Sequence, residues 1–159
     1  MYRLLLFPLL PYVTRWIAAQ ERRILAEGTP LSERSLADAR RIGVLHPERV
    51  RLLSVPQVPQ PGGAFIAFLG RCVGMPSENT AGLTARYGIF IRANQWGDRR
   101  LLAHELAHTA QYERLGGLRP FLRQYLMECL TTGYGGAPLE LEAIEAEAIV
   151  CSNPRTPLP

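Results

Sequence analysis

Residues 101 to 112 read LLAHELAHTAQY and place His104 and His108 four positions apart, with Glu105 directly after the first histidine. The whole chain contains three histidines, and two of them lie in this stretch. On an α-helix, residues four apart lie on the same face, so both imidazoles can reach one point in space. The stretch therefore predicts a helix that carries two neighbouring metal ligands.

The residue types at this spacing fit zinc. Zn²⁺ accepts imidazole nitrogens at about 2.0–2.1 Å, and His104 and His108 can supply two of them. Glu105 lies roughly 100° around the helix from His104, beside the ion but off the ligand axis. From there a carboxylate can accept a proton from an activated water and pass it to a leaving amine. The alternative is an amphipathic helix with two structural histidines and a solvent-facing glutamate.

Local signals mark the ends of this helix. Asp98 is a typical N-cap and Gly116-Gly117 a typical stop, which predicts a helix over about 98–115. Two more helices are predicted at about 119–132 and 138–151, with the segment TGYGGAP between them.

The last predicted helix offers a third ligand, because PLELEA contains Glu140 and Glu142. Successive residues rotate by about 100°, which puts Glu140 and Glu147 in the middle of an apolar stripe and Glu142 on the other side. A buried carboxylate is costly unless it is paired or binds a metal. We therefore expect Glu140 to be the ligand and Glu147 to orient a ligand histidine. The alternative is that Glu140 only favours the helix N-terminus through the helix dipole.

Three other polar residues have candidate roles. Tyr134 lies in a glycine-flanked loop and is a candidate to stabilise the oxyanion of a tetrahedral intermediate. Gln111 lies on the same helix face as His104, and we expect it to hydrogen-bond either a ligand or the neighbouring helix. His46, in LHPERV, is predicted to be a turn residue at the start of a strand.

Strands are predicted before the motif. Short aliphatic and β-branched runs indicate strands near 49–55 and 64–69. In LTARYGIFIR, residues 83–92, every second side chain is apolar or aromatic, starting at Leu83. This alternation predicts a third strand with one face towards the core.

The N-terminal part is predicted to be helical. Apolar residues recur at helical spacing over 12–27, and Gly28 follows. Thr29 and Pro30 suggest a cap and a first-turn proline for a second helix, which ends at Gly43. The chain is thus predicted to be one α+β domain, residues 1–159: a helical cover (1–43), a metal-site core with a small mixed sheet (44–151) and a tail (152–159).

Composition narrows the function classes. Hydrophobic residues make up 47 % and charged residues 20 %, as in ordinary globular proteins. The net charge of +4 comes from arginines spread along the chain without a basic run interleaved with aromatics, so we expect no nucleic-acid partner. The apolar start is short and is interrupted by Pro8 and Pro11, which argues against a signal peptide or a membrane span. A cytoplasmic location is expected, and contact of this start with a membrane surface stays open.

The segments GIFIR, LLAHELAHTAQY and GYGGAPLELEA together resemble the zincin superfamily. They are most similar to small bacterial proteins of the gluzincin type, in which H-E-x-x-H is followed by a glutamate ligand on a later helix. The resemblance covers about residues 49–150, is strongest at 104–111 and 138–143, and leaves the N-terminal helices outside. It implies a minimal zincin-like, metallopeptidase-like domain that binds one Zn²⁺.

The resemblance also implies a function. A zinc-dependent metallopeptidase would use Glu105 as general base. In zincins the strand before the motif helix borders the cleft, and Tyr87–Ile91 match it, so a peptide or protein substrate is expected to pair along this strand. Core packing is the alternative for that strand. The alternative for the whole chain is a zinc-stabilised, non-catalytic module that binds a peptide or protein.

Overall fold

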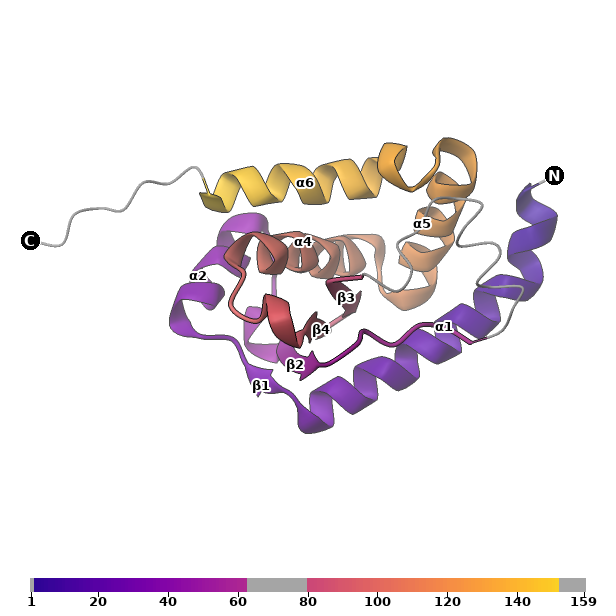
Figure 1. Cartoon of the computed structure of the whole chain (residues 1–159). Helices are drawn as coiled ribbons and strands as arrows, with labels where there is room; N and C mark the ends of the chain where they lie inside the picture. Colours follow the sequence, from indigo (N-terminus) through magenta and orange to yellow (C-terminus); the bar gives the residue numbers. More distant parts are fainter. Residues whose placement is uncertain (1, 63–79, 152–159) are drawn as a thin grey trace, which may run out of the picture.

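The structure is a computed structural model that describes residues 2–62 and 80–151. Within these ranges five α-helices and a four-stranded mixed sheet form an α+β fold (Figure 1). The helices are α1 (Tyr2–Glu27), α2 (Glu33–Ile42), α4 (Arg99–Leu115), α5 (Leu118–Thr132) and α6 (Pro138–Cys151). The strands are β1 (Thr29–Pro30), β2 (Arg51–Val55), β3 (Gly82–Ala85) and β4 (Gly88–Arg92), and the short 3₁₀ helices are η1 (Pro47–Arg49), η2 (Ala93–Gln95) and η3 (Tyr134–Gly136).

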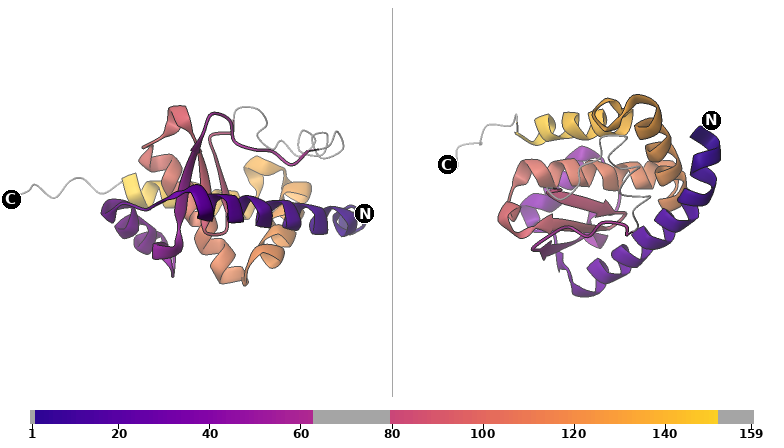
Figure 2. Two further views of the ribbon diagram at one scale, coloured as in Figure 1. Left: turned by 90° about the horizontal axis from the view of Figure 1, so that it is seen from below. Right: turned by 45° about the vertical axis from the view of Figure 1, so that its right-hand side comes forward.

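The elements are stacked in layers. In Figure 1, α1 runs below the sheet, α4 lies on the other side of the sheet, and α6 lies across α4 on the side away from the sheet; the turned views of Figure 2 agree. The centre of the sheet is fully enclosed, because Ile89 and Phe90 of β4 have no exposed surface. The motif helix α4 is therefore packed on both sides, between the sheet and α6.

The sheet has the strand order β1-β2-β4-β3. Strand β4 pairs in parallel with β2 and antiparallel with β3, while β1 pairs antiparallel with β2. The prediction of a small mixed sheet is confirmed. The strand expected near 64–69 lies outside the described residues.

The single strand predicted over 83–92 was wrong. The chain reverses at Arg86 and Tyr87, and β3 and β4 form a hairpin in which Ala85 lies opposite Gly88. Arg86 adopts a left-handed backbone conformation with φ 57°. Its side chain is held by Glu21 of α1, because Arg86 Nε donates to Glu21 Oε1 over 2.8 Å.

This hairpin also corrects the expected position of the sheet edge. Strand β4 has β2 on one side and β3 on the other, so the segment Tyr87–Ile91 has no free edge with which a peptide could pair. Among the described residues the outer strand on the motif side is β3, which pairs with β4 alone.

Helix α1 is longer than the predicted 12–27. It begins at Tyr2 and continues through Pro8 and Pro11, although a proline inside a helix removes a backbone hydrogen bond. Packing explains why the helix persists: Leu10, Val13 and Ile17 are buried in a core that α1 shares with α5 and the sheet. Tertiary contacts of this kind commonly outweigh local helix propensity.

The predicted start of the second helix was also wrong. Thr29 and Pro30 form strand β1 at the edge of the sheet, the position in a sheet where proline is tolerated. The N-cap is Ser32, whose hydroxyl accepts from the Ser35 N–H over 3.2 Å. The predicted stop at Gly43 is confirmed, with φ 104°.

No helix among residues 2–62 and 80–151 combines the length and the apolar character needed to cross a membrane.

Candidate metal centre

Helix α4 begins and ends as its local sequence predicts. The Asp98 carboxylate accepts from the N–H groups of Arg100 and Leu101 over 2.9 and 3.1 Å, and Gly116 ends the helix with φ 90°. Between these ends, α4 buries an unusual number of polar side chains, including Glu105, His108 and Gln111. Buried polar groups need partners, so this part of α4 is where a functional site is expected.

The structure brings His104, His108 and Glu140 together. One ligand atom from each lies within 4.8 Å of the other two. His104 Nε2 lies 3.4 Å from Glu140 Oε2, and His108 Nε2 lies 3.4 Å from Glu140 Oε1. These distances exceed those of a charge-assisted hydrogen bond, about 2.7–2.9 Å. They match the spacing of about 3.3 Å between ligand atoms bonded at 2.0–2.1 Å to one tetrahedral ion. The three residues thus have the spacing of a metal-binding group.

Each histidine is oriented through its other ring nitrogen. His104 Nδ1 lies 3.0 Å from Glu147 Oε1, as predicted for Glu147, and His108 Nδ1 lies 2.8 Å from Gln111 Oε1. Each of these oxygens is an acceptor, so Nδ1 carries the proton in both rings and donates it. In both rings Nε2 is then the nitrogen that faces Glu140, where it can hold either a proton or a cation.

The amide of Gln111 is itself fixed. Its Nε2 donates to the Leu139 carbonyl oxygen over 2.8 Å and to Glu142 Oε2 over 3.1 Å. With the amide nitrogen held by α6, the amide oxygen faces His108. The two roles considered for Gln111, contact with a ligand and contact with the neighbouring helix, therefore occur together.

The structure separates the two candidate glutamates of α6. Glu140 is buried, with 2 % of its surface exposed, whereas the Glu142 side chain is 46 % exposed and pairs with Arg114 on the surface. Burial disfavours the charge of Glu140, yet its contacts with the two imidazoles and with Tyr125 hold its pKa well below its usual range. Glu140 is the carboxylate that joins the histidines, as predicted from the apolar stripe.

Carboxylates dominate the charge around the histidines. Burial by itself would lower the pKa of His104, but Glu140, Glu105 and Glu147 outweigh it and raise this pKa to about 9. The cluster therefore attracts positive charge. A divalent cation would also balance the negative charge of these carboxylates, and the donor set of two imidazoles and one carboxylate fits such an ion.

Glu105 lies next to the three residues of the metal-binding group, and its carboxylate is bound by a residue of the sheet. It is 5 % exposed, and Thr84 Oγ1 of β3 donates to Glu105 Oε2 over 2.6 Å. A side chain at Gly82, on the same strand, would put its Cβ only 2.5 Å from Glu105 Oε1. Burial raises the pKa of Glu105 above its ordinary value, which favours its ability to take up a proton. The edge strand β3 thus shapes the space in which this carboxylate sits.

Two tyrosines approach Glu140 from the side of α5 and η3. Tyr134 is close enough to the Glu140 carboxylate for burial and that carboxylate to raise its pKa, so its hydroxyl keeps its proton. Tyr125 donates from its hydroxyl to Glu140 Oε1 over 2.6 Å and was not identified from the sequence. Its position four residues after Phe121 on one face of α5 indicated only core packing, and the ring does stack on Phe121.

Comparison with known proteins gives no match: no model of a protein family, no curated protein and no solved structure is similar to this chain. The likeness to gluzincins therefore stays a prediction that depends on the motif and on the residues assembled around it.

Proposed function

We propose that this chain is a minimal zincin-like metallopeptidase that hydrolyses peptide bonds with one Zn²⁺ held by His104, His108 and Glu140. One observation carries the proposal. His104 Nε2 and His108 Nε2 each lie 3.4 Å from a different oxygen of the buried Glu140 carboxylate, and buried Glu105 lies directly after His104 on α4.

The donor set favours zinc over other common ions. Imidazole nitrogen suits zinc, whereas calcium and magnesium prefer oxygen ligands. Three protein ligands are also the number typical of catalytic zinc sites, which keep a fourth position for water or substrate. Structural zinc sites are usually closed by four protein ligands.

Each residue of the site has a proposed role in peptide hydrolysis. His104, His108 and Glu140 would hold the zinc ion, which when bound would supply Lewis acidity for a peptide carbonyl and for the attacking water. Glu105 accepts the proton of the attacking water and delivers it to the leaving amine, for which its burial and its raised pKa are suitable. Thr84 holds the Glu105 carboxylate in place. The protonated hydroxyl of Tyr134 is the donor proposed for the developing oxyanion.

An extended substrate is proposed to pair with β3 rather than with β4. Among the described residues, β3 has a neighbouring strand on one side only, and it is the strand that contacts Glu105. A peptide that adds to this edge through backbone hydrogen bonds would pass the carboxylate closely.

Zinc dependence is the direct test of this function. The zinc-loaded protein is expected to cleave members of a quenched fluorogenic peptide library, to lose this activity after chelation, and to regain it when zinc is added back. Cleavage that survives removal of the metal would contradict the proposal. Binding of library peptides by the zinc-loaded protein without any cleavage would favour the non-catalytic binding module.

Replacing Gly82 by alanine is expected to reduce hydrolysis while zinc stays bound. The new Cβ would collide with the Glu105 side chain, 2.5 Å from Oε1 and 2.8 Å from Cδ, and would displace its carboxylate from the contact with Thr84. Misplacing a catalytic group by about 1 Å can cost on the order of 100-fold in rate, so we expect a loss of about 10–100-fold. Gly62→Ala is the matched control, since nothing lies within 4 Å of a Cβ there. Equal activity of the two variants would show that β3 does not position Glu105.

A further inference from the structure

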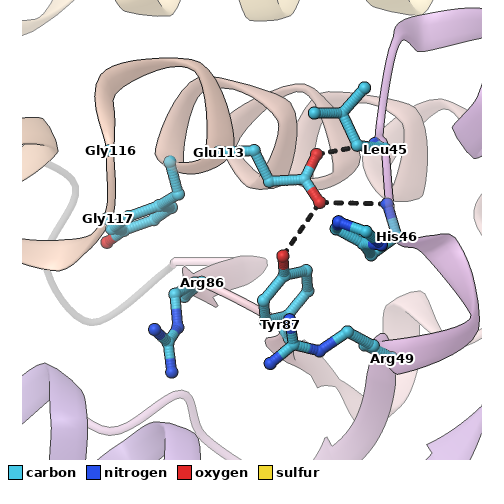
Figure 3. A pocket seen from close by; sticks show the side chains of 9 residues that line it. Leu45, His46, Arg49, Arg86, Tyr87, Glu113, Gly116 and Gly117 are labelled. Atoms are coloured by element: carbon cyan, nitrogen blue, oxygen red, sulfur yellow. Dashed lines mark hydrogen bonds between the residues drawn. The ribbon is translucent and has the colours of Figure 1, made fainter.

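A hollow lies at the C-terminal end of α4. It has a volume of about 270 Å³, and its walls come from η1 and the loop before it, the β3–β4 turn, and the end of α4 (Figure 3). None of the three residues of the candidate metal centre lines it. The hollow is therefore separate from the candidate metal centre.

The carboxylate in this pocket already has its partners. Glu113 accepts from the N–H groups of Leu45 and His46 over 2.6 and 3.0 Å, and from the Tyr87 hydroxyl over 3.0 Å (Figure 3). These three neutral donors fix the side chain and stabilise its carboxylate. Glu113 therefore links the loop before η1 to α4, and its carboxylate has little capacity left to bind a cation.

Two guanidinium groups lie over the same tyrosine ring. Arg49 Cζ is 4.1 Å and Arg86 Cζ 5.6 Å from the centre of the Tyr87 ring. Arg86 uses Nε to bind Glu21, behind the turn, and its terminal nitrogens have no hydrogen bond within the described parts of the chain. Arg49 forms no ion pair with any carboxylate of residues 2–62 and 80–151. The ring contact keeps both cations at the pocket, where their remaining donors can meet a ligand.

We propose that this pocket binds a carboxylate group, either of a small organic acid or at the C-terminus of a peptide. The planar fork of arginine matches a carboxylate with two parallel hydrogen bonds. Glu21 and Glu113 balance the charges of Arg49 and Arg86, so the pocket offers directed hydrogen-bond donors without an excess of positive charge. Such a setting suits a monoanion better than a phosphate dianion, whose second negative charge would have no counter-charge. The volume of about 270 Å³ lies just below the usual range of small-molecule pockets, about 300–1,000 Å³, which suits a small acid or the end of a chain.

The test is a titration followed by two-dimensional NMR, with acetate, N-acetyl-dialanine, its C-terminal amide and inorganic phosphate as probes. The acid form of the dipeptide is expected to shift the backbone amide signals of His46 and Gly117 in a saturable way, and the amide form is expected to leave them unchanged. Arg49→Gln should weaken binding at least about tenfold, because it removes charged hydrogen-bond donors to the carboxylate. Arg34→Gln, which removes an equally exposed charge on α2, should not.

The probes also separate the two sources of the carboxylate. Acetate that binds as well as the dipeptide would assign the pocket to small acids, and a clear preference for the dipeptide would assign it to peptide C-termini. Either result supports a carboxylate site. Equal binding of the acid and the amide, tighter binding of phosphate, or an unchanged affinity in Arg49→Gln would overturn the proposal.

Discussion

Replacing Glu105 by glutamine is expected to lower kcat about 10²–10⁴-fold, the range typical of losing a general acid–base, while the zinc content stays the same. Glutamine keeps the size of the side chain, and its amide oxygen can still accept the Thr84 hydroxyl that now binds Glu105. It cannot take up a proton from the attacking water. Burial already disfavours the charge of Glu105, so the neutral amide should not unfold the protein.

This variant distinguishes the two function classes. Hydrolysis of a peptide from the library and zinc content are measured on the same preparation, with Glu145→Gln on the exposed side of α6 as the control. If Glu105→Gln cleaves the peptide as fast as the control, Glu105 has no role as base and the proposed mechanism is wrong.

Replacing Glu140 by glutamine is expected to have the largest effect on zinc affinity of any single change in α6. It removes the charge of a proposed ligand that lies 3.4 Å from both imidazole nitrogens. Loss of a group that merely orients a ligand costs roughly 10–100-fold in affinity, so loss of the ligand itself should exceed this range. Glu147→Gln, which weakens the contact with His104 Nδ1 and the exposed pair with Arg100, should fall within it.

Glu142→Gln is the matched control for Glu140→Gln, two residues further along the same helix. Its carboxylate is exposed and pairs with Arg114, and such surface pairs contribute about 0–1 kcal/mol. The amide oxygen of the new glutamine can still accept from Gln111 Nε2, which the Leu139 carbonyl also holds. Zinc affinity measured by competition with a chromogenic chelator should therefore change by a few-fold at most. The reverse order of Glu140→Gln and Glu142→Gln would show that the wrong carboxylate has been assigned as the ligand.

The parts of the site that the sequence predicts depend on helical geometry alone. The bounds of α4 follow from Asp98 and Gly116, which act on their own backbone neighbours. Glu140 is distinguished from Glu142 because one rotation of about 100° per residue decides which of them faces the core. The same rotation places Glu147 on the face of Glu140, and in the structure it contacts one of the two histidines, His104.

The parts that the sequence does not reveal depend on contacts between distant segments. Thr84 and Tyr125 reach Glu105 and Glu140 from β3 and α5, and no local pattern marks either residue as part of a site. The β3–β4 turn was missed because two residues reverse the chain without interrupting the alternation of side chains. Arg86 accepts its left-handed conformation without being glycine, since Glu21 and the Thr109 hydroxyl bind its side chain and its carbonyl oxygen.

The central claim is that His104, His108 and Glu140 together hold one zinc ion. A crystal structure of the purified protein, with diffraction data collected on both sides of the zinc absorption edge, tests it most directly. We predict one anomalous peak per chain, about 2.0–2.2 Å from Nε2 of each histidine and from a Glu140 oxygen, with no fourth protein ligand. No zinc peak in crystals grown with added zinc, or a peak bound to other residues, would contradict the claim.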